Sequence, residues 1–147
     1  MIVDKVLKTF PREILVVSPG EKVIGAARKF EQKRIGIAMV CGESGILEGV
    51  MSLGDIVHAL GDRGAETLDL PVRLVMTPDP VTCEPDEDIE SALAKMSDRG
   101  IRHLPVVDHD KPVGLIDKIA ALQVLYDVAA LDFAQLRNYV FKTGGRY

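Results

Sequence analysis

The chain has 147 residues, 47% apolar and 27% charged, a balance typical of a globular protein with enough chain to bury a core. The net charge of −4 indicates no basic surface that could bind nucleic-acid phosphates. Only 5% of the residues are aromatic, so few side chains could stack on bases, and nucleic acid is not an expected partner. The longest apolar run, 35–41, is too short to span a bilayer, and residues 1–5 lack a signal-peptide pattern. We therefore expect a cytoplasmic protein with no membrane segment.

Cysteine and histidine usage predicts neither a disulfide nor a metal centre. Cys41 and Cys83 lie in separate apolar segments without C-x-x-C spacing, which is typical of buried thiols in a reducing compartment. His58 and His109 lie apart from other ligand types, so no metal is required.

The first elements in chain order are a short helical arm and a unit of strand, helix, strand, strand, helix. Residues 1–13 form the arm, because apolar residues recur at helical spacing and Pro11 then ends the helix. The elements of the unit are expected at 14–17, 22–34, 35–41, 46–51 and 53–60.

Two pairs in this unit have the spacing of a capping box, in which side chain and backbone satisfy each other at a helix start. They are Ser18 with Glu21 and Ser52 with Asp55. The second pair follows a glycine turn and has another interpretation. A helix N-terminus favours anions, and a carboxylate there can accept both hydroxyls of a ribose. The residues alone leave both interpretations open.

The unit recurs with an offset of 66 residues, which indicates a tandem duplication. Matched pairs at this offset are Pro19 with Pro85, Val23 with Ile89, Phe30 with Met96 and Ile35 with Ile101. Gly49 matches Gly114 after one deleted turn residue. The prediction is an α/β (α+β) fold of two β-α-β-β-α repeats, residues 14–66 and 67–126. A C-terminal helical extension follows at 127–147, with Asp127 and Asp132 as candidate points of interruption.

Several strings in the second repeat together resemble a tandem cystathionine β-synthase (CBS) domain pair, or Bateman module. These strings are Val75–Pro78, Val81–Asp86, Gly100–Asp108 and Gly114–Ile116. The first repeat fits too, and small bacterial stand-alone pairs are the most similar. The resemblance implies two repeats about a pseudo-twofold axis, two clefts between them, and a regulatory role without catalysis.

The resemblance also implies an adenine-containing ligand, AMP first, with ADP, ATP, NAD(H) or S-adenosylmethionine as alternatives. A Gly-x-x-Ser/Thr-x-x-Asp string holds the ribose in this family, and Gly49, Ser52 and Asp55 satisfy it. In the second repeat, Asp117 and Ala120 replace the hydroxyl and the ribose carboxylate. An Asp repels a phosphate and Ala offers no acceptor, so we expect one competent site per chain.

By the same analogy, the ligand phosphate is expected to contact the neighbouring repeat, which offers Arg102 and His103. The residues expected beside the base are Gly36, Ile37, Met51 and Ile14. Methionine at such a position is also typical of plain core.

Three classes of function follow: an adenine-nucleotide sensor, an interaction or scaffold module with a vestigial pocket, and an enzyme. The enzyme is disfavoured, because the sequence has no nucleophile with a base at hand, no metal cluster and no phosphate loop. A sensor also implies a regulated protein that reads its conformation.

A homodimer is expected, because the second helices of the two repeats carry apolar stripes that need a partner surface. The stripe residues are Ile56, Val57, Leu60, Ile119, Leu122 and Val124. In the alternative, residues 125–140 fold back over the stripes and keep the chain monomeric.

Overall fold

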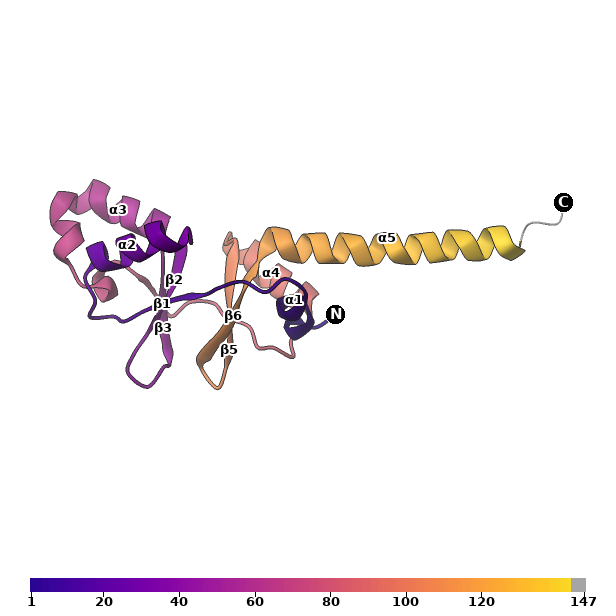
Figure 1. The fold of residues 1–147 in the computed structure, drawn as a ribbon, viewed down its shortest axis with the longest axis horizontal. Coiled ribbons are helices and arrows are strands. Elements are labelled where there is room, and N and C mark those ends of the chain that lie inside the picture. The colour runs from indigo at the N-terminus through magenta and orange to yellow at the C-terminus, as the bar shows by residue number, and fades with distance from the viewer. Residues whose placement is uncertain (144–147) are drawn as a thin grey trace.

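The computed structural model describes residues 1–143 and places two repeated units side by side, with a long helix extending from the second (Figure 1). The unit nearer the N-terminus in sequence carries a four-stranded sheet, and the other carries a two-stranded sheet. Their helices lie toward the two outer ends of the pair, so the sheets face each other across the middle.

The first repeat has the predicted order of strand, helix, strand, strand, helix. Its elements are β1 (Leu15–Val17), α2 (Val23–Lys33), β2 (Ile37–Cys41), β3 (Leu47–Ser52) and α3 (Leu53–Arg63). β1 pairs parallel with β2, and β2 pairs antiparallel with β3. A short strand from the linker, β4 (Thr77–Pro78), completes the sheet in the order β1-β2-β3-β4.

The second repeat follows the same order with its first strand reduced to one bridge, between Cys83 and Val106. Its elements are α4 (Ile89–Arg99), β5 (His103–Asp108), β6 (Lys111–Asp117) and α5 (Lys118–Thr143). β5 and β6 pair antiparallel. The predicted fold class of two β-α-β-β-α repeats is therefore confirmed.

Each repeat has its own apolar core, and each core also contains residues from the arm or from the segment that links the repeats. The arm helix α1 (Val3–Thr9) inserts Val3 and Val6 into the core of the second repeat. Two 3-10 helices, η1 (Gly64–Asp69) and η2 (Val72–Leu74), cover the first repeat, where Val72 is fully buried. These exchanges tie the repeats together, because separating them exposes apolar surface.

A third apolar cluster joins the repeats at their sheets. Its buried members are Met39, Cys41 and Leu115. Cys41 and Cys83 are buried free thiols, and burial raises the pKa of Cys83 to about 12. Burial, with the nearby Glu48 charge, also raises the pKa of Cys41, so both thiols are protonated at neutral pH.

α5 is one continuous helix, so the predicted interruption at Asp127 or Asp132 is wrong. An aspartate in a helix interior costs less than about 1 kcal/mol, and Gln123 donates a hydrogen bond to Asp127 at 2.9 Å. The fold-back alternative is wrong as well, because α5 projects away from the repeats (Figure 1). Residues 144–147 of the expected C-terminal extension lie outside the described residues.

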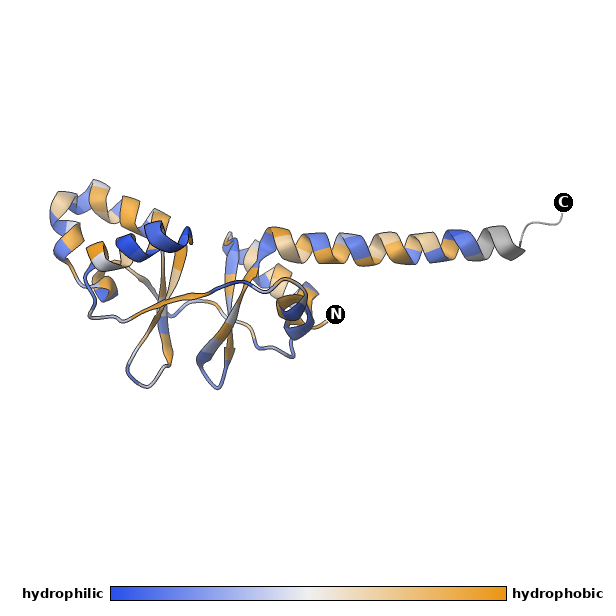
Figure 2. Ribbon diagram, in the orientation of Figure 1, coloured by the Kyte–Doolittle hydropathy of each residue, from blue (hydrophilic) through white to orange (hydrophobic). Residues whose placement is uncertain are grey.

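Residues Lys118–Asn138 of α5 are long and apolar enough to cross a membrane by length and composition, with 11% of the segment buried. Figure 2 shows apolar and polar residues mixed along this helix. Single polar residues divide this segment, so it contains no long continuous apolar run. The expectation of no membrane segment stays a prediction.

Candidate functional site

A cleft of about 510 Å³ lies between the repeats, within the range of about 300–1,000 Å³ that small-molecule sites occupy. We name it the Asp55 cleft. The first repeat lines it with Ile37, Val50, Ser52 and Asp55. The linker contributes Thr77, Pro78, Asp79, Pro80 and Val81, and the second repeat contributes Arg99, Ile101, Arg102, His103 and Pro105.

Ser52 and Asp55 form a reciprocal capping box at the start of α3. The Ser52 N–H donates to Asp55 Oδ2 at 2.8 Å, and the Asp55 N–H donates to Ser52 Oγ at 3.2 Å. Thr77 Oγ1 donates to Asp55 Oδ1 at 3.2 Å. The capping interpretation is therefore confirmed. Each carboxylate oxygen accepts one of these bonds, and because each has two lone pairs, both keep capacity for a ligand hydroxyl.

A second cleft of about 340 Å³ is related to the first by the repeat symmetry; we name it the Arg12 cleft. Its lining is Pro11, Arg12, Glu13, Lys33, Arg34, Ile35, Gly36, Ile37, His103 and Leu115. Ile37 and His103 line both clefts, because they are matched positions on β2 and β5 near the pseudo-twofold axis.

Asp117 ends β6 beside the Arg12 cleft and caps the start of α5. Its Oδ1 accepts from the backbone N–H groups of Ile119 at 2.8 Å and Ala120 at 3.3 Å. Asp117 thus caps the N-terminus of α5 as Ser52 caps that of α3. Unlike Ser52, it also places a full negative charge at the helix N-terminus.

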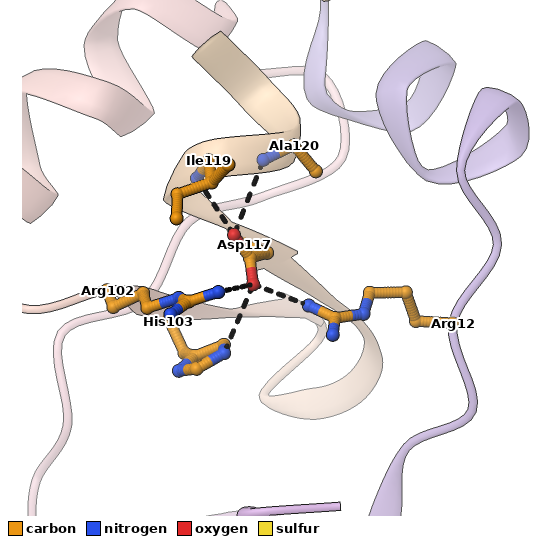
Figure 3. A network of polar contacts seen from close by, with 6 residues as sticks. All are labelled: Arg12, Arg102, His103, Asp117, Ile119 and Ala120. Carbon is orange, nitrogen blue, oxygen red and sulfur yellow. Dashed lines mark hydrogen bonds and ion pairs between the residues drawn. The ribbon is translucent and has the colours of Figure 1, made fainter. Parts of the chain in front are cut away.

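The other oxygen of Asp117 gathers three cationic or titratable side chains (Figure 3). Arg12 Nη1 donates to Oδ2 at 2.8 Å, while Arg102 Nη2 and His103 Nε2 each lie 3.4 Å from it. The Asp117 side chain is only 5% exposed, whereas that of Arg102 is 60% exposed. The network links the N-terminal arm, β5 and the first turn of α5.

The protonation states in this network follow from burial and hydrogen bonding. Burial alone would raise the pKa of Asp117. The hydrogen bonds from Arg12 and from two backbone N–H groups, together with the nearby Arg102 charge, have the larger effect and hold the pKa below its ordinary value. Burial lowers the pKa of His103 and outweighs the opposite effect of Asp117. At neutral pH, Asp117 is therefore ionised and His103 is mostly neutral.

The structure gathers five of the predicted site residues on the Asp55 cleft and places three elsewhere. The five are Ile37, Ser52, Asp55, Arg102 and His103. Met51 is fully buried in the first core, because side chains alternate along β3 and Val50 and Ser52 take the cleft side.

Gly36 and Ile14 are the other two corrections, and the repeat symmetry explains both. Gly36 matches Arg102 at the offset of 66, so it lines the Arg12 cleft instead. Ile14 matches Pro80, which lines the Asp55 cleft; Ile14 itself packs against the third apolar cluster.

The sequence reasoning missed three polar lining residues, Thr77, Asp79 and Arg99. Thr77 lies in the Val75–Pro78 string that carried part of the family resemblance, but the string alone gave it no role. Arg99 matches Lys33 of the Arg12 cleft at the repeat offset, which is the signal that could have found it. Within residues 1–143, no three His, Cys, Asp or Glu side chains come together to hold a metal ion.

The fold and its two clefts define a tandem-repeat module with small-molecule sites between the repeats. The family model for the CBS domain matches residues 7–62 and 72–127, most of the chain. The chain therefore belongs to the CBS domain family, and the resemblance found in the sequence is confirmed. CBS pairs are in general regulatory modules rather than catalytic ones.

Known relatives and structures have the same organisation. The CBS domain-containing protein YhcV of Bacillus subtilis is 30% identical over 113 residues, covering 77% of this chain and 79% of that protein. The structure of CBSX2 in complex with AMP has a TM-score of 0.67 at 24% identity, covering 79% of this chain and 90% of that one. The CBS pair of MJ0100 with 5′-methylthioadenosine and S-adenosyl-L-methionine has a TM-score of 0.74 at 21% identity, covering 86% and 97%.

Proposed function

We propose that this chain is a regulatory module that binds one adenine nucleotide in the Asp55 cleft, AMP before ADP, ATP, NAD(H) or S-adenosylmethionine. The main support is one juxtaposition: Ser52 and Asp55 of the intact Gly-x-x-Ser-x-x-Asp string line the same cleft as Arg99 and Arg102 of the other repeat. A ribose acceptor thus lies across from two guanidinium groups that suit a phosphate. The similar folds that hold AMP and S-adenosyl-L-methionine support the same ligand class.

The existing contacts leave the phosphate-binding cation available. Arg102 lies 3.4 Å from Asp117, a long contact on an exposed side chain, so a doubly charged phosphate competes well for it. Arg12 keeps its 2.8 Å bond to Asp117 when Arg102 turns away, so that carboxylate stays paired. Val50, Ile37 and the linker prolines supply apolar surface for the base.

The Arg12 cleft is proposed to stay empty of nucleotide. The Asp117 carboxylate occupies the N-terminus of α5, the position that would otherwise favour an anion, and Arg12 is committed to it. Ala120 provides no acceptor for a ribose hydroxyl. One nucleotide per chain follows from this asymmetry.

The proposed context is a cytoplasmic homodimer that a regulated protein recognises. Val57 on α3, with Ile119 and Leu122 on α5, are each at least half exposed and support the self-association, as does the neighbouring Leu53. Ile56 and Val124 of the expected stripe are instead buried in the cores of the two repeats. Ligand in the cleft between repeats would change their relative position and so the surface that the regulated protein contacts.

Calorimetry on Asp55→Asn tests the site, with Asp62→Asn at the far end of α3 as the control. The asparagine keeps an acceptor for the Ser52 N–H but loses the charge and the second acceptor for ribose. We expect AMP affinity to fall roughly 10- to 30-fold in Asp55→Asn and to stay unchanged in the control. Equal affinity in all three proteins would refute the site, and no binding by wild type would favour a scaffold with a vestigial pocket. Mass spectrometry of small molecules released from the purified protein would identify the ligand.

A further inference from the structure

An apolar stripe runs along α5 at alternating spacings of three and four residues, the pattern of a coiled-coil seam. We name it the α5 seam; its residues are Ile119, Leu122, Tyr126, Ala129, Phe133 and Leu136. All six side chains are exposed. In the heptad notation, Ile119, Tyr126 and Phe133 take position a, and the other three take position d.

The seam faces away from the repeats. The side of α5 that packs on the second repeat carries Ala121 and Val124, which are buried and lie on the other side of the helix. Leu125 still packs against the core of the second repeat, and α5 then projects away from the repeats (Figure 1). The seam residues after Leu125 are exposed. The described chain therefore offers no surface of its own to cover it.

Charges beside the seam select the direction of a partner helix. Asp132 takes position g and Arg137 takes position e, and both are exposed. In a parallel, in-register pair, position g of one helix meets position e five residues later on the other, so Asp132 meets Arg137 of a second copy on both sides. An antiparallel pair opposes g with g and e with e, and the two charges do not meet.

We propose that the α5 seam pairs with that of a second copy of this chain as a parallel, in-register, two-stranded coiled coil. Asp127, at position b, then points to water, whereas in a bilayer it would face lipid close to the middle of the apolar segment. The same helix chemistry thus favours a second copy over a membrane. This pairing is independent of nucleotide binding, so either proposal can fail alone.

Oxidative cross-linking tests the direction and the face. Leu136→Cys places a thiol on the seam near the end of the helix, and Leu131→Cys places one on the opposite side; the two leucines are 61% and 59% exposed. Both native cysteines are buried, so wild type controls for their reaction. We expect a disulfide-linked dimer from Leu136→Cys alone. Monomer from Leu136→Cys, or equal dimer from both variants, would overturn the proposal.

Charge exchange tests the pairing without a new thiol. Asp132→Lys and Arg137→Glu should each weaken dimerisation measured by sedimentation, by roughly 3- to 10-fold, and the double variant should restore it. Absence of rescue would contradict the parallel register. Flotation with phosphatidylcholine and phosphatidylglycerol vesicles distinguishes the membrane: wild type that floats while Leu136→Cys fails to cross-link would assign the seam to lipid.

Discussion

Replacing Asp117 with asparagine removes the charge from the network that joins the arm, β5 and α5. The carboxylate is 5% exposed and accepts a 2.8 Å bond from Arg12, together with two backbone N–H bonds. Asparagine keeps a carbonyl oxygen for the backbone donors, so the helix cap survives. The loss is therefore confined to the charge-assisted contacts with Arg12 and Arg102.

The size of that loss follows from the geometry. A hydrogen bond to a charged group contributes about 1.5–3 kcal/mol. Because the Arg12 side chain is 45% exposed and regains water when released, screening reduces the value to about 1–2 kcal/mol. For a chain of this length, that corresponds to a fall in Tm of roughly 3–6 °C.

Urea denaturation at a series of pH values measures the loss of stability in Asp117→Asn. Asp98→Asn, on the exposed side of α4, is the control. The pKa of Asp117 is lowered in the folded state, so its contribution is present above the ordinary value of 3.8 and is lost as the pH falls through the folded value. The gap between wild type and Asp117→Asn should thus close in acid. Equal stability at pH 7, or a gap that does not narrow as the pH falls below 3.8, would refute the reasoning.

Two further predictions concern the cleft and its supporting backbone. Arg102→Gln should weaken AMP binding roughly tenfold and leave adenosine affinity within about twofold, because only the phosphate contact is lost; an equal loss for both ligands would contradict this role. Gly49→Ala should lower the free energy of unfolding by about 1–3 kcal/mol, since its Cβ would lie 2.8 Å from the Thr77 carbonyl oxygen. Gly20→Ala, with open space at its Cβ, is the control, and equal stability of the two variants would be evidence against the close approach.

The duplication made most of the fold predictable. Turn, helix face and strand agreed at one offset, and the expected elements of the first repeat lie within a few residues of those observed. Capping was less predictable: Ser52 and Asp55 form their box, but Ser18 and Glu21 do not. Helix α2 begins at Val23 without a side-chain cap, and Glu21 instead pairs with Lys29.

Side-chain direction and long-range pairing limited the prediction of the site. Met51 is expected beside the base, but side chains alternate along β3 and that of Met51 is buried in the core. The contact between Arg12 and Asp117 joins residues 105 positions apart, so no local sequence pattern predicts it. Gly36 matches Arg102 at the repeat offset, and this match predicts that Gly36 lines the Arg12 cleft.

Calorimetric titration of the wild-type protein with AMP tests the central claim most directly, because it reports affinity and the number of sites together. The asymmetry between Asp55 and Ala120 predicts a stoichiometry of one nucleotide per chain. Two equivalent sites per chain, or no binding of AMP and of the other adenine-containing ligands, would contradict the account.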